Sequence, residues 1–311
     1  MGAEMIHGAH DGQPTLDVSI VLPVYNEAGH LGEEIARIRR SMDASEFSYE
    51  IVVVDDGSAD GSGEMLREID GIRLLQFSQN RGSGSARKYG TMVARGRVVV
   101  WTDVDMTYPN DQMPQLVRDL AGYDQVVGAR RTEEGTLKLL RRPAKWLIRK
   151  LASYLTGVKI PDLNSGFRAF RRDVGLQFVH LLPPGFSCVT TLTMTFLSNG
   201  YSVRYVLIDY QARAGESKFH WWSDTRRYLL QVMRMVLSYQ PLKVFMPPAV
   251  VLGIAGVAKL VYDLVDKDFR VGTNTLVVLG VALALAMIGM AADLMVQLSR
   301  PEHEVMPAVG E

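Results

Sequence analysis

Short runs of β-branched residues alternate along most of the chain with segments whose apolar residues recur at helical spacing. The clearest helical segment has Leu31, Ile35, Ile38 and Met42 on one face. The predicted strands cover residues 18–25, 50–56, 72–77, 98–105, 125–129 and 203–210. Strands and helices that alternate with short links predict an α/β domain with a doubly wound, mostly parallel sheet.

Acidic residues end two of these predicted strands. Asp55-Asp56 end the second, and Asp103 and Asp105 end the fourth. Ligands of open α/β sheets bind at this carboxyl edge, and side chains two residues apart lie on the same side of an extended strand. Two such carboxylates repel each other unless a divalent cation lies between them and a diphosphate. The pattern therefore predicts a cation site, with an ordinary solvated turn as the alternative.

Composition narrows the function classes. The 311 residues are 47% hydrophobic and carry a formal net charge of zero, which predicts one or two domains with a proper core and argues against a general nucleic-acid binder. Cys188 is the only cysteine, so no internal disulfide forms, and we expect it to belong to the core. The six histidines show no zinc-site spacing.

The C-terminal part contains two long apolar segments. Residues 244–262 and 273–298 are each long enough to span a bilayer, so we predict a transmembrane hairpin over 244–298. A pair of buried core helices is the alternative. The first 17 residues lack the apolar region of a cleavable signal peptide, and we interpret them as a flexible tail.

A helix with a polar stripe precedes the first span. Arg227, Gln231, Arg234 and Ser238 recur at helical spacing within residues 225–243, and apolar residues cover the rest. This pattern is typical of a helix that lies in the membrane interface, with packing on the globular domain as the alternative. The predicted organisation is a tail (1–17), a globular domain (18–224), the interface helix (225–243), the hairpin (244–298) and a second tail (299–311).

Charge predicts the orientation of the hairpin. Four cations lie between residues 226 and 243 and Arg300 follows the second span, whereas the connecting loop 263–272 carries three Asp against two cations. The positive-inside rule then places the globular domain and both termini in the cytoplasm, as a multi-pass protein of the inner or plasma membrane.

Six short motifs occur in a characteristic order. They are Pro23-Val24-Tyr25-Asn26-Glu27, Asp55-Asp56-Gly57-Ser58, Asn80-x-Gly82-x-Gly84-x-Ala86, Asp103-x-Asp105, Ser165-Gly166-Phe167-Arg168 and Arg213-x-Gly215-x-Ser217-Lys218. Together they resemble the family 2 glycosyltransferases of GT-A fold, and within them the polyprenyl-phosphate sugar synthases, the dolichol-phosphate-mannose-synthase-like group. The likeness covers residues 18–218 and the membrane segment.

This resemblance implies a fold and an activity. The fold is a Rossmann-like GT-A catalytic domain followed by the interface helix and the hairpin. The implied activity is an inverting, metal-dependent transfer of one hexose from a nucleoside-diphosphate sugar (GDP- or UDP-linked) to a membrane polyprenyl monophosphate, for cell-envelope or glycan assembly. The partners are these two substrates and the lipid bilayer, without nucleic acid, and a homo-oligomer is left open.

The resemblance also implies residue roles. Asp103 and Asp105 are the catalytic pair and the metal-binding residues; Asp105 is the principal ligand of Mg²⁺ or Mn²⁺, and Asp103 lies near the ribose and sugar. The nucleotide-sugar pocket comprises Pro23, Tyr25, Glu27, Asp55, Asp56, Gly82, Gly84 and Asp103. The acceptor-phosphate residues are Arg130, Arg168, Arg213, Ser217 and Lys218, because Arg and Lys can pair with phosphate. A structural cap is the alternative for the glycine loop, as is a solvated basic face for each cation.

One stretch departs from the family pattern. Residues 185–192 carry no carboxylate where many relatives have an acid. A phosphate acceptor is already ionised and needs positioning more than a base, so the departure fits that acceptor but leaves donor recognition near Thr190 and Thr191 open.

Two rival functions remain at this point. One is a transferase that extends a lipid-linked saccharide or a polysaccharide, although Gln231-x-x-Arg234 is followed by Met235 where a processive synthase has Trp. The other is a non-catalytic membrane scaffold or flippase accessory protein, which has no use for clustered acidic residues.

The topology is testable by labelling. A cysteine placed at Asp268, with Cys188 replaced to remove background, should react with an impermeant reagent added to intact cells, because the loop is predicted to face outward. Labelling only after permeabilisation would indicate buried helices or the opposite orientation.

Overall fold

The computed structural model describes residues 16–131, 149–185, 187–210, 239–266 and 270–299. The chain forms two compact units, residues 1–220 and 221–311, and each is considered by itself. The predicted interface helix lies largely outside the described residues, as do most of the N-terminal tail and all but the first residue of the C-terminal one.

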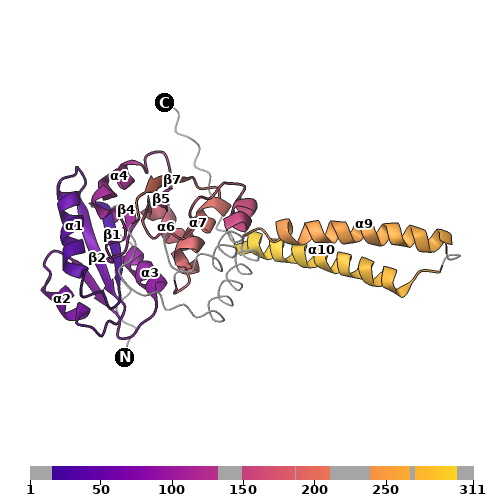
Figure 1. The fold of residues 1–311 in the computed structure, drawn as a ribbon, viewed down its shortest axis with the longest axis horizontal. Helices are drawn as coiled ribbons and strands as arrows, with labels where there is room; N and C mark the ends of the chain where they lie inside the picture. Colours follow the sequence, from indigo (N-terminus) through magenta and orange to yellow (C-terminus); the bar gives the residue numbers. More distant parts are fainter. Residues whose placement is uncertain (1–15, 132–148, 186, 211–238, 267–269, 300–311) are drawn as a thin grey trace. The chain divides into compact units, whose positions relative to one another are not determined.

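A seven-stranded sheet forms the centre of the first unit (Figure 1). Its strands are β1 (Leu16–Val24), β2 (Tyr49–Asp55), β3 (Arg73–Gln76), β4 (Gly96–Trp101), β5 (Gln125–Arg130), β6 (Arg168–Arg171) and β7 (Val203–Ile208). They are ordered β3-β2-β1-β4-β6-β5-β7. Only the pairs that include β6 are antiparallel, so the predicted mostly parallel α/β sheet is confirmed.

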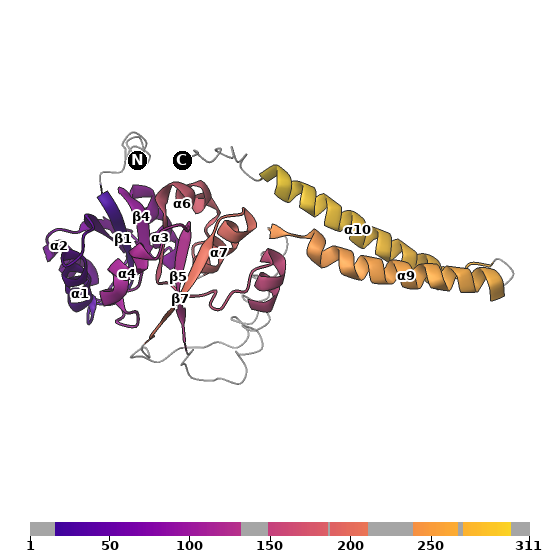
Figure 2. The ribbon, with the colours of Figure 1, turned by 90° about the horizontal axis from the view of Figure 1, so that it is seen from above.

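Helices cover both faces of this sheet (Figures 1 and 2). The described helices of the unit are α1 (Leu31–Asp43), α2 (Ser62–Glu68), α3 (Ser83–Val93), α4 (Met113–Arg118), α6 (Arg172–Phe178) and α7 (Cys188–Ser198), with 3-10 turns at 110–112 and 179–181. A further helical segment covers 149–156. One buried cluster joins the sheet to α1 and α4, and a second joins its other face to α3, α6 and α7.

Alternation along β1 shows how the sequence builds these layers. Ile20 and Leu22 lie in the cluster with Ile35 of α1, whereas Val21 lies in the cluster with Ala86 of α3. Successive side chains of a strand point to opposite faces, so a continuous apolar run serves a sheet that is covered on both sides.

Strand β6 is the element that the sequence interpretation missed. It is four residues long and begins and ends with arginine, which hid it inside a basic motif. Because it runs against β4, Arg168 pairs with Trp101 at the carboxyl end of β4. The loop before β6 therefore arrives at the same edge as the loops that follow the parallel strands.

The fourth predicted strand is shorter than expected. β4 ends at Trp101, and Met106 adopts a left-handed φ of 61°. The prediction that Asp103 and Asp105 share one side of an extended strand is therefore wrong, since both belong to an irregular loop.

The second unit contains two long apolar helices, α9 (Leu242–Asp266) and α10 (Thr273–Ser299), which run side by side in Figures 1 and 2. Both are long and apolar enough to cross a membrane. Only 11% and 17% of their most apolar windows are buried, which argues against buried core helices.

Small or polar residues line the contact between these two helices. The buried positions recur every seventh residue: 249, 256 and 263 on α9, and 275, 282, 289 and 296 on α10. A seven-residue repeat keeps one seam facing a partner helix. A Cβ atom at Gly256 would lie 2.6 Å from Leu279 Cδ2, so a larger residue there would require the Leu279 side chain to move. At the turn, Asp263 accepts hydrogen bonds from the Gly272 N–H (3.0 Å) and the Thr275 hydroxyl.

We expect Gly256→Leu to lower the stability of the hairpin by roughly 1–3 kcal/mol, because overpacking forces the helices apart. Gly253→Leu is the matched control, since nothing lies within 4 Å of a Cβ atom placed at that glycine of the same helix. Thermal unfolding in detergent measures the difference. Equal melting temperatures for the two variants would contradict the packing described here.

Candidate active site

The loops that follow β1 and β2 form one hydrogen-bonded unit. The Asn26 N–H donates to Ser58 Oγ (3.0 Å), and the Ala59 N–H donates to Asn26 Oδ1 (2.9 Å). Asn26 has a left-handed φ of 55°, and the Glu27 N–H donates to Ser62 Oγ (3.1 Å). The first two motifs therefore fix one another, and Tyr25 lies at their exposed rim with 47% of its surface accessible.

Asp55 and Asp56 are both buried and hold backbone in place. Asp55 accepts from the Ser58 N–H (3.0 Å) and from Gln76 Nε2 (3.2 Å). Asp56 accepts from the N–H groups of Arg81 (2.7 Å) and Gly82 (2.8 Å). Their contact with a nucleotide stays a prediction; in this structure the two carboxylates hold the loops after β2 and before α3.

The glycine loop before α3 packs against protein backbone. A Cβ atom at Gly82 would overlap the carbonyl of Pro184, and one at Gly84 would overlap that of Pro183. The N–H groups of Gly84 (2.7 Å) and Ser85 (3.2 Å) both donate to the Pro184 carbonyl, which caps α3. These glycines therefore admit the turn at 183–185, which fits the alternative of a structural cap, and their contact with a nucleotide sugar stays a prediction.

Arg87 of α3 forms an ion pair with Asp103. The arginine is 1% exposed and its Nη2 donates to Asp103 Oδ1. Its Nε and Nη1 have no hydrogen-bond partner among the described residues, and its guanidinium lies 5.8 Å from the Trp101 ring centroid. Burial by itself would lower the pKa of Arg87, but the Asp103 carboxylate raises it above the ordinary value. Asp103 therefore faces a permanent buried cation.

Gly166 lets the loop before β6 approach this pair. A Cβ atom there would lie 2.9 Å from Asp103 Oδ2, and the Gly166 N–H donates to the Tyr108 hydroxyl (2.7 Å). Tyr108 stacks on Phe167 with ring centroids 5.8 Å apart. Burial raises the pKa of Tyr108, so its hydroxyl stays protonated. The Ser-Gly-Phe-Arg motif thus shapes the wall beside Asp103.

Asp105 is partly buried and directly precedes Met106, whose backbone is left-handed. Its Oδ1 accepts from the Thr107 hydroxyl (2.6 Å) and the Thr107 N–H (3.3 Å), across the left-handed Met106. Within the described ranges, no three His, Cys, Asp or Glu side chains gather to hold a metal. A hard cation that takes Asp105 as a carboxylate ligand can complete its shell with ligand oxygens and water, so the residues fit Mg²⁺ or Mn²⁺ bound together with a diphosphate.

Arg130 ends β5 at the same edge and is held by a carboxylate. Its Nε and Nη2 donate to Asp162 at 2.7 and 3.0 Å, and its guanidinium lies 5.2 Å from the Tyr210 ring centroid. Although burial alone would raise the pKa of Asp162, the hydrogen bond and charge of Arg130 hold it below the ordinary value. A phosphate role for Arg130 stays a prediction.

Arg168 does not fit its predicted role as an acceptor-phosphate residue. It is fully buried, and its guanidinium donates to the carbonyls of Ser165 and Val189 (2.7 Å) and to Thr193 Oγ1 (2.9 Å). Burial lowers its pKa to about 10. This arginine joins β6 to α7 and has no surface for a lipid headgroup. The other three predicted acceptor residues, Arg213, Ser217 and Lys218, lie outside the described residues.

Cys188 is buried at the start of α7, and burial raises the pKa of its thiol, so its expected place in the core is confirmed.

Sequence reasoning missed Arg87, Tyr108 and Asp162 at this edge. The sequence contains one signal for Arg87: it lies three and four residues before Gly90 and Thr91, on the same face of the helix. The structure shows that all three residues are buried. Tyr108 and Asp162 gave none, because their partners are distant in the sequence.

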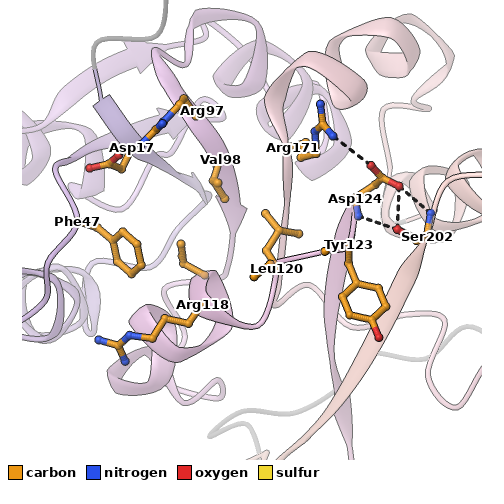
Figure 3. A pocket seen from close by; sticks show the side chains of 13 residues that line it. Asp17, Phe47, Arg97, Val98, Arg118, Leu120, Tyr123, Asp124, Arg171 and Ser202 are labelled. Atoms are coloured by element: carbon orange, nitrogen blue, oxygen red, sulfur yellow. Dashed lines mark hydrogen bonds and ion pairs between the residues drawn. The ribbon is translucent and has the colours of Figure 1, made fainter. Parts of the chain in front are cut away.

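The pocket in Figure 3 is a different feature. It measures about 750 Å³ and opens where the strands begin, at the opposite edge of the sheet. Its charged groups already have partners: Arg97 pairs with Asp17, and Asp124 lies 3.6 Å from Arg171 and accepts from Ser202. The predicted motifs contribute no residue to it.

The fold and the acidic loop after β4 define a class of protein, the GT-A glycosyltransferases. Two solved structures of glucosyl-3-phosphoglycerate synthase from Mycobacterium tuberculosis share this fold. One, with phosphoglyceric acid, has a TM-score of 0.55 and 20% identity over 72% of this chain and 80% of that chain. The other contains Mn²⁺, UDP and phosphoglyceric acid; it has a TM-score of 0.55 and 22% identity over 72% and 78%.

The family follows from the sequence comparison. Residues 19–175 match the model of glycosyl transferase family 2. The chain belongs to this family and is a glycosyltransferase, as the motifs predicted.

Several curated relatives are named as polyprenyl-phosphate sugar enzymes. An undecaprenyl-phosphate 4-deoxy-4-formamido-L-arabinose transferase of Aeromonas hydrophila is 32% identical over 65% of this chain and 62% of its own length. A dodecaprenyl-phosphate galacturonate synthase of Rhizobium johnstonii is 24% identical over 92% and 88%. A dolichyl-phosphate hexose transferase of Haloferax volcanii is 34% identical over 65% and 86%. The match spans less than two thirds of the Aeromonas enzyme.

The ion pair generates a stability prediction. Asp103→Asn leaves the buried Arg87 without a counter-charge, and we expect it to cost up to about 3–5 kcal/mol, toward the lower end because Asp103 is 29% exposed. Adding Arg87→Met should recover part of the loss, because the double variant buries no unpaired charge. Thermal unfolding in detergent is the measurement.

Glu46→Gln is the control for this series. It breaks the exposed Arg118–Glu46 pair, which water screens, and should leave the melting temperature nearly unchanged. If Asp103→Asn is no more destabilising than Glu46→Gln, the Arg87–Asp103 pair is not the buried ion pair described above.

Proposed function

We propose that this glycosyltransferase moves a single sugar, with inversion, from a nucleoside-diphosphate sugar to a membrane polyprenyl monophosphate. The observation that carries the proposal is the meeting of Asp105, the Arg87–Asp103 pair and the Arg130–Asp162 pair at one edge of the sheet. The names of the curated relatives support the acceptor class, and the two apolar helices support a membrane location.

The donor side comprises the loops after β1, β2 and β4. Tyr25 is exposed at their rim, and Asp55 and Asp56 hold the surrounding backbone. Asp103 pairs with Arg87, and its carboxylate oxygens can accept hydrogen bonds from ribose or sugar hydroxyls. Asp105 is then the carboxylate left to hold Mg²⁺ or Mn²⁺, which when bound would stabilise negative charge on the departing diphosphate. Mn²⁺ in a structure of the same fold supports this assignment.

The acceptor side is proposed to include Arg130 at the end of β5. A phosphate monoester is already an anion, so the protein has to position its oxygen and needs no base to deprotonate it. Arg130 offers a guanidinium whose orientation is fixed by the buried Asp162. Arg213, Ser217 and Lys218 are proposed to complete the phosphate site, and the hairpin to keep the catalytic unit at the cytoplasmic membrane surface.

Extension of a lipid-linked saccharide is the second candidate. It shares the donor site but ends on a sugar hydroxyl, which needs a base to remove its proton. No carboxylate lies between residues 185 and 192, which favours the phosphate acceptor. Transfer to polyprenyl phosphate that carries no sugar distinguishes the two.

The two sides of the site should separate in binding experiments. Arg130→Ala combined with Asp162→Ala removes the guanidinium without leaving a buried carboxylate unpaired. We expect it to raise the KM for polyprenyl phosphate about 10- to 150-fold, the value of a charge-assisted phosphate contact, and to leave nucleotide affinity nearly intact. Asp105→Asn should instead abolish transfer and weaken Mn²⁺-dependent nucleotide binding. Initial rates give the first quantity and calorimetry the second.

Arg131→Ala serves as the control, because Arg131 is exposed and lies 3.6 Å from Asp209. Loss of nucleotide binding in the Arg130 and Asp162 double variant would overturn the two-sided site. Full transfer by Asp105→Asn in EDTA would overturn the metal assignment.

A further inference from the structure

Glu34 of α1 is a carboxylate inside the apolar layer that covers the sheet. It is fully buried between Leu31, Ile35 and Ile38 of the same helix. Its Oε1 accepts a hydrogen bond from Asn110 Nδ2 (2.6 Å), whereas its Oε2 has no hydrogen-bond partner among the described residues. A buried polar group with an unsatisfied oxygen is costly, so its presence in a packed core requires an explanation.

Asn110 closes the base of the Asp-x-Asp loop. Its Oδ1 accepts from the Thr102 hydroxyl (2.6 Å), and its Nδ2 donates both to Glu34 and to the Asp103 carbonyl (3.3 Å). Thr102 directly precedes Asp103, and both Thr102 and Asn110 are fully buried. One amide side chain therefore ties the start of the loop to its end, and Glu34 fixes that amide to α1.

The loop between these anchors needs such support. It carries Asp105 next to Met106, whose φ of 61° is unfavourable for a side chain of that size. Backbone strain of this kind persists only where the surroundings over-determine it. Helix α1 supplies further contacts, since Arg37 Nη1 donates to the Tyr108 carbonyl (3.3 Å) and Ser41 Oγ donates to the Asp111 carbonyl (2.8 Å).

We propose that Glu34 is a positioning residue, which through its hydrogen bond to Asn110 holds the Asp105 loop in the conformation that binds the donor. The positioning step stands on the contacts alone, and the link to donor binding rests on the proposed function. The Glu34 Oε1 atom accepts its hydrogen bond from a neutral amide, and the same oxygen lies 3.7 Å from Arg37 Nη1 in a longer ion pair. Burial raises the pKa of Glu34 above its ordinary value.

Two substitutions separate the hydrogen bond from the charge. Glu34→Gln keeps an acceptor for Asn110 and removes the charge, whereas Glu34→Leu fills the space and removes the acceptor. Glu33→Leu is the matched control, because Glu33 directly precedes Glu34 in α1 and is exposed. Thr102→Val is a second route to the same loss, since it keeps the side-chain volume and removes the donor to Asn110.

Hydrogen exchange in the metal-free, full-length protein in detergent tests the positioning step. Amides of residues 103–111 should exchange roughly 10-fold faster in Glu34→Leu and also faster in Thr102→Val, with β1 and β2 unchanged, because the loop loses a net hydrogen bond. Glu34→Gln and Glu33→Leu should behave as the wild type. Unchanged loop exchange in both Glu34→Leu and Thr102→Val would overturn the proposal, as would a Glu34→Gln variant that exchanges like Glu34→Leu.

Calorimetry with Mn²⁺ and UDP or GDP tests the link to the donor. Glu34→Leu should raise the nucleotide Kd by roughly 10-fold, and Glu34→Gln should restore it. Faster loop exchange with an unaltered Kd would overturn this link. Wild-type protein that binds neither nucleotide would count against the proposed function and not against the positioning step, which the exchange data decide.

Discussion

Parallel pairing of β1 with β2 and β4 is the constraint from which the rest of the catalytic unit follows. Parallel strands end at the same edge of a sheet, so the loops after Val24, Asp55 and Trp101 lie next to one another at that edge. β6 extends this rule by running backwards, which brings the loop before Arg168 to the same edge. Loops that are far apart in the sequence thus surround one site because of the direction of their strands.

Buried polar side chains do much of the work of shaping that edge. Asp56 holds the backbone at 81–82, Arg168 holds the loop before β6 on α7, and Arg87 holds Asp103. Each of these interactions adds little net free energy to the stability of the folded protein. Removing one partner is costly, because the other is left buried without a hydrogen bond or counter-charge. Substitutions at such positions therefore disturb geometry and stability together, so activity alone does not identify the residues that touch substrate.

The sequence predicted those parts of the fold that depend on local pattern. Continuous β-branched runs gave β1, β2, β4 and β5 to within a few residues, and uninterrupted apolar segments gave α9 and α10. The four-residue β6 escaped because arginines bound it. The pattern did not reveal the protein partners of Arg168 and of the glycine loop, because these partners, in α7 and the turn at 183–185, lie between about 20 and about 100 residues away. A side chain's type indicates what it can bind, but only the fold decides whether a protein group already occupies it.

The repeat of buried small residues along α9 and α10 has a geometric consequence for the bilayer. At 1.5 Å per residue, helices of 25 and 27 residues are about 38 and 40 Å long, whereas a hydrocarbon core is about 30 Å thick. Tilting absorbs such an excess. The close contact at Gly256 and the hydrogen bonds of Asp263 to Gly272 and Thr275 join the two helices, so neither helix can tilt without the other. Membrane thickness would then set the tilt of the whole hairpin from the membrane normal. The two helices would tilt together as one rigid unit, and the tilt would be larger in a thinner bilayer.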